Sequence, residues 1–143
     1  MQYKIFTTVG TSITKKLSFS GFDDKSFHEN WEKGNNRKAT FCSNKPTWEN
    51  NIERHLNNTQ LSAEISSLLK IAESNPKDTF DVYLLCTDTL ESAVCAWAIQ
   101  QWFEGNKDKY PKFSAVCFDF TKDHIVKNLR ITNQTDYDSG FMA

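Results

Sequence analysis

The stretch Tyr3-Lys4-Ile5-Phe6-Thr7-Thr8-Val9-Gly10-Thr11-Ser12 decides the fold class that the sequence predicts. Residues 3–9 are mostly β-branched and aromatic, and Gly10 interrupts them, a pattern typical of a short strand followed by a turn. Because this strand is apolar along nearly its whole length, we expect it at the centre of a parallel sheet that is buried on both faces.

The turn Gly10-Thr11-Ser12 is the first candidate site. In parallel sheets, ligands bind beyond the carboxyl ends of the strands, which is where this turn lies. Glycine lets the backbone approach a ligand closely, and the two hydroxyl groups can hydrogen-bond a phosphate, a ribose or a base. An ordinary strand-to-loop turn has the same composition, so the motif alone leaves both interpretations open.

Two later segments, residues 80–86 and 113–118, are also predicted strands. A helix from Leu90 to about Phe103 is expected between them, with a wide apolar stripe and with Gly105 as its stop. Strands that alternate with helices predict an α/β domain. We expect a Rossmann-like, three-layer fold with a mainly parallel sheet in which the three strands are adjacent.

The region between the first two strands is predicted to hold a long insert and two helices. The insert, about residues 21–46, is polar and irregular but keeps aromatic residues. We expect either a lid or a solvent-exposed loop that those aromatics anchor. Pro46 opens the first helix, with Thr47 as its N-cap. The second helix is expected over residues 60–74, with Thr59 as its cap.

The 143 residues are expected to form one domain, 1–143, with a net charge of −1. Without a net positive charge, the chain is not expected to hold long nucleic acid by counterion release, although a few local donors suffice for a small anion. The N-terminus lacks a signal peptide, and no apolar run approaches the ~20 residues that span a bilayer. We therefore expect a soluble, cytoplasmic protein without a membrane segment.

The four cysteines, Cys42, Cys86, Cys95 and Cys117, form no CxxC pair, and three of them lie in apolar segments. Buried free thiols are therefore expected. The three histidines are scattered without the spacing of metal ligands, so the sequence predicts no metal site.

A second candidate turn, Thr87-Asp88-Thr89, leads straight into a helix whose first turn contains Glu91 and Ser92. Free backbone N–H groups and the positive end of the helix dipole point towards anything bound there. An ordinary helix N-cap is the alternative interpretation. Two such turns on one edge of a parallel sheet predict a polar crevice suited to a nucleotide, although neither the P-loop nor the dinucleotide-binding glycine pattern is present.

Three stretches resemble one known family, in the expected order. Residues 6–12 resemble the first-strand signature of CARF domains, the CRISPR-associated Rossmann-fold sensors. Residues 82–89, followed by Glu91-Ser92-Ala93, look like that family's second signature. The tail at 126–132, with Tyr137 and Gly140, looks like the segment that often follows the core strands there. The insert at 21–46 has no counterpart in this resemblance.

The resemblance implies the sensor domain of a type III CRISPR antiviral effector, a homodimer that binds cyclic tetra- or hexa-adenylate across its two-fold axis. No further cofactor is expected. CARF domains usually stand beside an effector domain, so we expect this chain to be the sensor portion of a longer protein. The resemblance places these residues at the ligand: Gly10, Thr11 and Ser12 on ribose or phosphate, and Thr87, Asp88, Thr89 and Ser92 along the pocket wall.

Three other functions stay open at this point, one of them a scaffold whose crevice is empty and whose aromatic insert binds protein. A stand-alone ring nuclease would cleave the cyclic oligoadenylate slowly and without a metal, with Ser12 positioning the ribose and Lys15 or Lys16 neutralising charge on the phosphate. A mononucleotide-binding protein would use the same crevice for ATP or AMP. Because the sequence identifies no strong general base, we expect binding with slow or absent cleavage.

Overall fold

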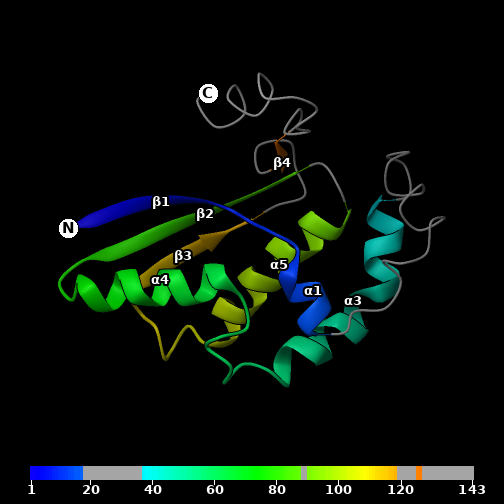
Figure 1. The fold of residues 1–143 in the computed structure, drawn as a ribbon, viewed down its shortest axis with the longest axis horizontal. Coiled ribbons are helices and arrows are strands. Elements are labelled where there is room, and N and C mark those ends of the chain that lie inside the picture. Colours follow the sequence, from blue (N-terminus) through cyan, green and yellow to red (C-terminus); the bar gives the residue numbers. More distant parts are fainter. Residues whose placement is uncertain (18–36, 88–89, 119–124, 127–143) are drawn as a thin grey trace.

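The computed structural model describes residues 1–17, 37–87, 90–118 and 125–126; of residues 37–40, 90 and 125–126 it describes only the backbone. The elements follow one another (Figure 1) in the order β1 (Gln2–Thr8), α1 (Ser12–Lys16), α3 (Arg37–Glu53), α4 (Ala63–Ser74), β2 (Thr79–Thr87), α5 (Leu90–Gly105), β3 (Phe113–Cys117) and β4 (Ile125–Val126). Strands alternate with helices, so the predicted α/β class is confirmed.

The three long strands form one parallel sheet in the order β1-β2-β3. β1 pairs with β2 from Gln2↔Thr79 to Thr8↔Leu85, and β3 pairs with the other side of β2. β4 adds a short parallel pairing at Cys86 and Thr87, the last residues of β2. The prediction that the three strands are parallel and adjacent is therefore confirmed.

The prediction that β1 occupies the centre of the sheet is wrong, because β2 lies there. Every second residue of β2 is buried, from Phe80 to Cys86, and the intervening residues are half-buried. In β1, by contrast, five of the seven side chains are exposed. An apolar strand sequence is compatible with both positions, and only the pairing with two neighbours selects β2.

The two faces of this sheet differ. The described helices gather on one side of it (Figure 1), and α5 packs against both β2 and β3 on that side. The opposite face carries Phe6, which is 64% exposed and stacks on Tyr83 with ring centroids 5.0 Å apart. The described part of the chain thus forms two layers, and the third layer of the expected fold stays a prediction.

Helix α5 is the centre of the hydrophobic core. Its residues from Ser92 to Ile99 are all buried, which is the pattern of a helix that is covered on every side. The sheet covers one side, and α1 and α3 pack on others. The structure therefore confirms the helix that the sequence predicts from residue 90 to about residue 103.

Helix α3 begins at Arg37, so the prediction that Pro46 opens this helix is wrong. A proline inside a helix removes one backbone hydrogen bond and crowds the preceding turn. Aromatic packing on both sides of Pro46 offsets this cost. Trp48 is fully buried, and Phe41 meets Trp97 of α5 edge to face at a centroid distance of 5.0 Å. Residues 37–46 of the expected irregular insert are therefore helical, and its remainder, 21–36, lies outside the described residues. The lid or exposed loop expected over this insert stays a prediction.

Helix α4 begins after Ser62, so the prediction of Thr59 as its cap is also wrong. The backbone N–H of Ile65 donates to Ser62 Oγ at 3.2 Å, which is the usual N-cap hydrogen bond. Ser62 is buried, so this cap fixes the start of α4 against the body of the domain.

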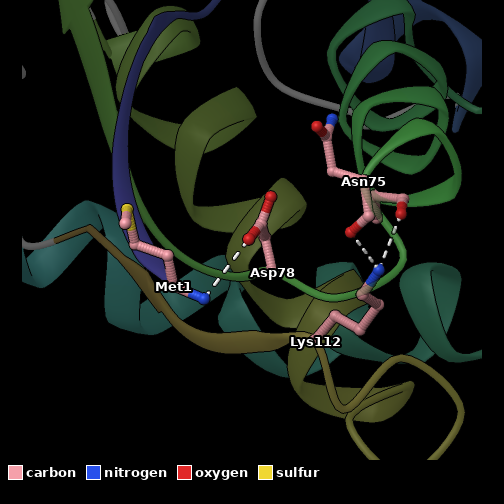
Figure 2. Close-up of polar contacts among 5 residues, drawn as sticks. Met1, Asn75, Asp78 and Lys112 are labelled. Atoms are coloured by element: carbon pink, nitrogen blue, oxygen red, sulfur yellow. Dashed lines mark hydrogen bonds and ion pairs between the residues drawn. The ribbon is translucent and has the colours of Figure 1, made fainter.

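A lysine from outside the helix closes the other end of α4. Figure 2 shows Lys112, from the turn before β3, pointing at the last turn of α4. Its Nζ donates to the carbonyl oxygen of Ala72 at 2.8 Å and to that of Asn75. Nearby, the Met1 amino group pairs with Asp78 Oδ1 at 3.3 Å. The Lys112 contacts tie the start of β3 to α4, and the Met1–Asp78 pair joins the start of β1 to that of β2.

Replacing Lys112 with methionine is expected to lower the free energy of unfolding by about 1–2 kcal/mol. The substitution removes two hydrogen bonds from a charged donor and leaves the carbonyl groups at the helix end without their cation. Urea unfolding followed by tryptophan fluorescence measures this change. Lys77→Met, at an exposed position in the turn after α4, is the matched control and should leave stability within about 0.5 kcal/mol. Equal effects of the two substitutions would contradict the capping role.

Candidate functional site

The candidate turns meet at the carboxyl edge of the sheet. The ladder between β1 and β2 extends past Thr8, because the Val9 N–H donates to the carbonyl oxygen of Leu85 at 2.9 Å. Gly10 follows Val9, two residues beyond the end of β1, and Thr87 lies two residues beyond Leu85 on β2. Parallel pairing in this register brings Gly10-Thr11-Ser12 and Thr87 to the same edge.

The first turn is held by a carboxylate that the sequence analysis did not select. The Gly10 N–H donates to Glu64 Oε1, in the first turn of α4, at 3.0 Å. Thr11 precedes α1 with φ −111° and ψ 14°, and its side chain makes no capping hydrogen bond. Ser12, the first residue of α1, is exposed. The turn therefore offers solvent the Ser12 side chain, while the Gly10 amide already has an acceptor.

The second turn is partly described. Thr87 Oγ1 donates to Ser92 Oγ at 2.7 Å, which connects the end of β2 to the first turns of α5. Ser92 is 5% exposed, so it supports Thr87 from below and contributes little open surface. The other two predicted residues of this turn, Asp88 and Thr89, lie outside the described residues.

Helix α1 is joined to α5 beneath the site. The buried Thr14 hydroxyl lies 2.9 Å from both the carbonyl oxygen of Thr11 and Glu91 Oε1. Cys95, one turn further along α5, also contacts Thr14, and burial raises the pKa of its thiol to about 12. The negative charges of Glu91 and Glu64 raise the pKa of Cys95 further. This thiol stays protonated at neutral pH and is no nucleophile.

The two candidate lysines lie at the other end of α1. Both Lys15 and Lys16 are exposed. Lys16 Nζ donates to the carbonyl oxygen of Gln60, in the loop before α4, at 3.0 Å. Lys16 thus has a structural partner away from the turn, which weakens its case as a group that neutralises a phosphate.

The other cysteines are free and differ in exposure. Cys86 is buried like Cys95, as expected, whereas Cys117 is half-buried and Cys42 is exposed on α3. Within residues 1–17, 37–87, 90–118 and 125–126, no three His, Cys, Asp or Glu side chains are grouped so as to hold a metal ion. Nor does any helix in those ranges have the length and apolarity needed to cross a membrane.

Two of the cavities on the described surface lie away from the candidate turns. One, of about 270 Å³, lies between α3 and α5, and its walls include Glu49, Glu53 and Glu104. The other, of about 610 Å³, lies beside α4, and its walls include Lys70 and Lys112. Neither of these two cavities is lined by the described residues of the candidate turns.

Comparison with known proteins gives one family. The family described as CRISPR-associated protein (Cas_APE2256) matches residues 59–132, more than half of the chain. The matched segment contains Glu64 and the second turn, whereas Gly10-Thr11-Ser12 precedes it. A search of curated proteins finds no match. On the extent of the family match, this chain belongs to the CRISPR-associated Cas_APE2256 family.

Proposed function

We propose that this chain is the cyclic oligoadenylate-binding sensor domain of a type III CRISPR antiviral effector, and that two copies bind the ring across a two-fold axis. Membership of a CRISPR-associated family supports the biological setting. The observation that carries the proposal is the register of β1 and β2. It places the Gly10-Thr11-Ser12 turn beside Thr87 at one edge of a parallel sheet, the position where such sheets bind ligands.

The chemistry of this edge suits a small nucleotide. The exposed Ser12 hydroxyl can donate to a phosphate oxygen or accept from a ribose hydroxyl. The 16-residue helix α5 starts at the same edge, and its dipole favours a negative charge there. A net charge of −1 gives no broad positive field, so these local donors would hold a small ligand and no long nucleic acid.

The symmetry of the expected ring favours a shared site. A two-fold symmetric ring can contact the same turn on two copies, because an isologous interface presents one patch twice. The proposed complex therefore holds one ring for two chains.

Calorimetric titration with cyclic tetra-adenylate and cyclic hexa-adenylate, beside ATP and AMP, tests the proposal. We expect one of the rings to bind at one ring per two chains. Ser12→Ala should weaken this binding roughly ten- to a hundredfold, the cost of losing about 1.5–3 kcal/mol of hydrogen bonding to a charged group. Ser67→Ala, at an exposed position on α4, is the matched control and should bind like the wild type.

The same samples distinguish the alternatives. Binding of ATP or AMP without binding of either ring would contradict the sensor function and favour a mononucleotide-binding protein. Chromatography of the titrated rings reports cleavage, which we propose to be slow or absent because Lys16 is bound to Gln60. Rapid conversion of the ring to linear fragments, abolished by Ser12→Ala, would favour the ring nuclease instead.

A further inference from the structure

A negative side chain is built into the proposed site. Glu64 is half-buried, and its carboxylate oxygen is 3.0 Å from the amide nitrogen of Gly10, a residue otherwise open to solvent. Two contacts fix α4 and so the position of this carboxylate: the buried Ser62 cap at its start and the Lys112 hydrogen bonds at its end. Glu64 thus stands on a helix that is anchored at both ends, and its carboxylate is held to the turn by the Gly10 N–H.

A second carboxylate contacts α1 itself. Glu91 Oε1 is 2.9 Å from the Thr14 hydroxyl. The charges of both Glu64 and Glu91 raise the pKa of the Cys95 thiol, which lies in the core on α5. Any ligand phosphate that approaches the Gly10 amide meets a like charge.

The strength of that repulsion depends on the kind of phosphate. A phosphate monoester carries a charge of about −1.5 to −2 at neutral pH. A phosphodiester in a nucleic acid backbone carries a single charge. Coulomb repulsion is proportional to the charge, so a fixed carboxylate opposes a monoester more strongly than a diester at the same distance.

We infer that Glu64 is a specificity-determining residue, which makes this site favour singly charged phosphodiesters over ligands with a terminal phosphate. The inference rests on the proposed function in taking this edge as the nucleotide site. Cyclic oligoadenylates contain only diesters, whereas AMP, ATP and linear fragments with a terminal phosphate carry the more strongly repelled group. Glu64 would therefore exclude the abundant cellular mononucleotides from the site.

Glu64→Gln is the informative substitution, because the glutamine carbonyl can still accept the Gly10 hydrogen bond while the charge is lost. The probes are AMP and 3′,5′-cyclic AMP, which share a base and a ribose and differ in having a monoester or a diester. Calorimetry should show affinity for AMP rising about tenfold, and affinity for cyclic AMP rising by about threefold or less, because a monoester carries nearly twice the charge. Glu73→Gln, at the far end of α4, removes the same charge and should change neither affinity.

An unchanged ratio of AMP to cyclic AMP affinity in Glu64→Gln would overturn the inference, and so would a lower affinity for AMP. Failure of both nucleotides to bind either protein at millimolar concentration would overturn it as well. Amide hydrogen exchange at Gly10 should be similar in the wild type and in Glu64→Gln, which checks that the turn is intact. A separate titration with the cyclic rings tests the proposed function. A changed ratio of AMP to cyclic AMP affinity, without binding of either cyclic ring, would support the role of Glu64 in specificity and contradict the proposed sensor function.

Discussion

Replacing Gly10 with valine should abolish ring binding, with a loss of about a hundredfold or more, while the domain stays folded. A side chain at this position holds the ligand away from the backbone and from Ser12, so at least one or two hydrogen bonds to a phosphate are lost. Each is worth about 1.5–3 kcal/mol, and a hundredfold loss of affinity corresponds to about 2.7 kcal/mol. Titration calorimetry with the ring that the wild type binds measures this loss.

The fold itself does not require glycine at this position. The backbone of Gly10 is outside the left-handed region, and the one described atom that an added Cβ would meet is Glu64 Oε1, at an ordinary contact distance of 3.6 Å. Gly10→Ala is therefore the control for folding, and its melting temperature should match that of the wild type. A Gly10→Val protein that is folded and binds the ring with unchanged affinity would show that the ligand does not approach this turn.

The sequence located the strands because each is a run of apolar and β-branched residues between polar breaks. It located α5 for a similar reason, since apolar residues recur along it at helical spacing. The order of the strands within the sheet could not be predicted from such local patterns. β1 and β2 are both apolar, and the central place of β2 follows from pairing between segments that are distant in the sequence.

The helix boundaries failed where tertiary contacts outweighed local preference. Pro46 is a sound local signal for a helix start, yet Phe41 and Trp48 on either side of it both pack near Trp97 of α5. Ser62 and Thr59 are both of a residue type that caps helices. Ser62 is the cap in the structure because its buried hydroxyl accepts from the Ile65 amide.

The candidate site was predictable in outline only. The two turns could be found because small hydroxyl residues follow apolar strands. Glu64 could not be found, because an acidic residue in the first turn of a helix is common and nothing local connects it to Gly10. Ser92 was expected to line the pocket, but its side chain is buried beneath Thr87. Such contacts depend on how α4 and α5 pack on the sheet.

Trp102→Ala should produce the largest loss of stability, about 3–5 kcal/mol in the free energy of unfolding. Trp102 is fully buried in α5, where its ring meets Phe103 edge to face at 5.0 Å and stacks on Tyr110 at 5.7 Å. Its indole N–H donates to the carbonyl oxygen of His55 at 3.2 Å, which ties the turn after α3 to the core helix. Truncation therefore removes packing and a hydrogen bond together, and leaves a cavity.

Urea unfolding followed by circular dichroism measures this loss without relying on the fluorescence of the substituted tryptophan. Domains of this size are stable by only about 5–15 kcal/mol, so Trp102→Ala alone risks leaving too little folded protein to compare. Trp102→Phe keeps an aromatic ring and loses the hydrogen bond to His55, and it should cost about 1–2 kcal/mol. A loss below about 1 kcal/mol for the alanine variant would be too small for a buried tryptophan. It would show that Trp102 does not hold the turn after α3 against α5.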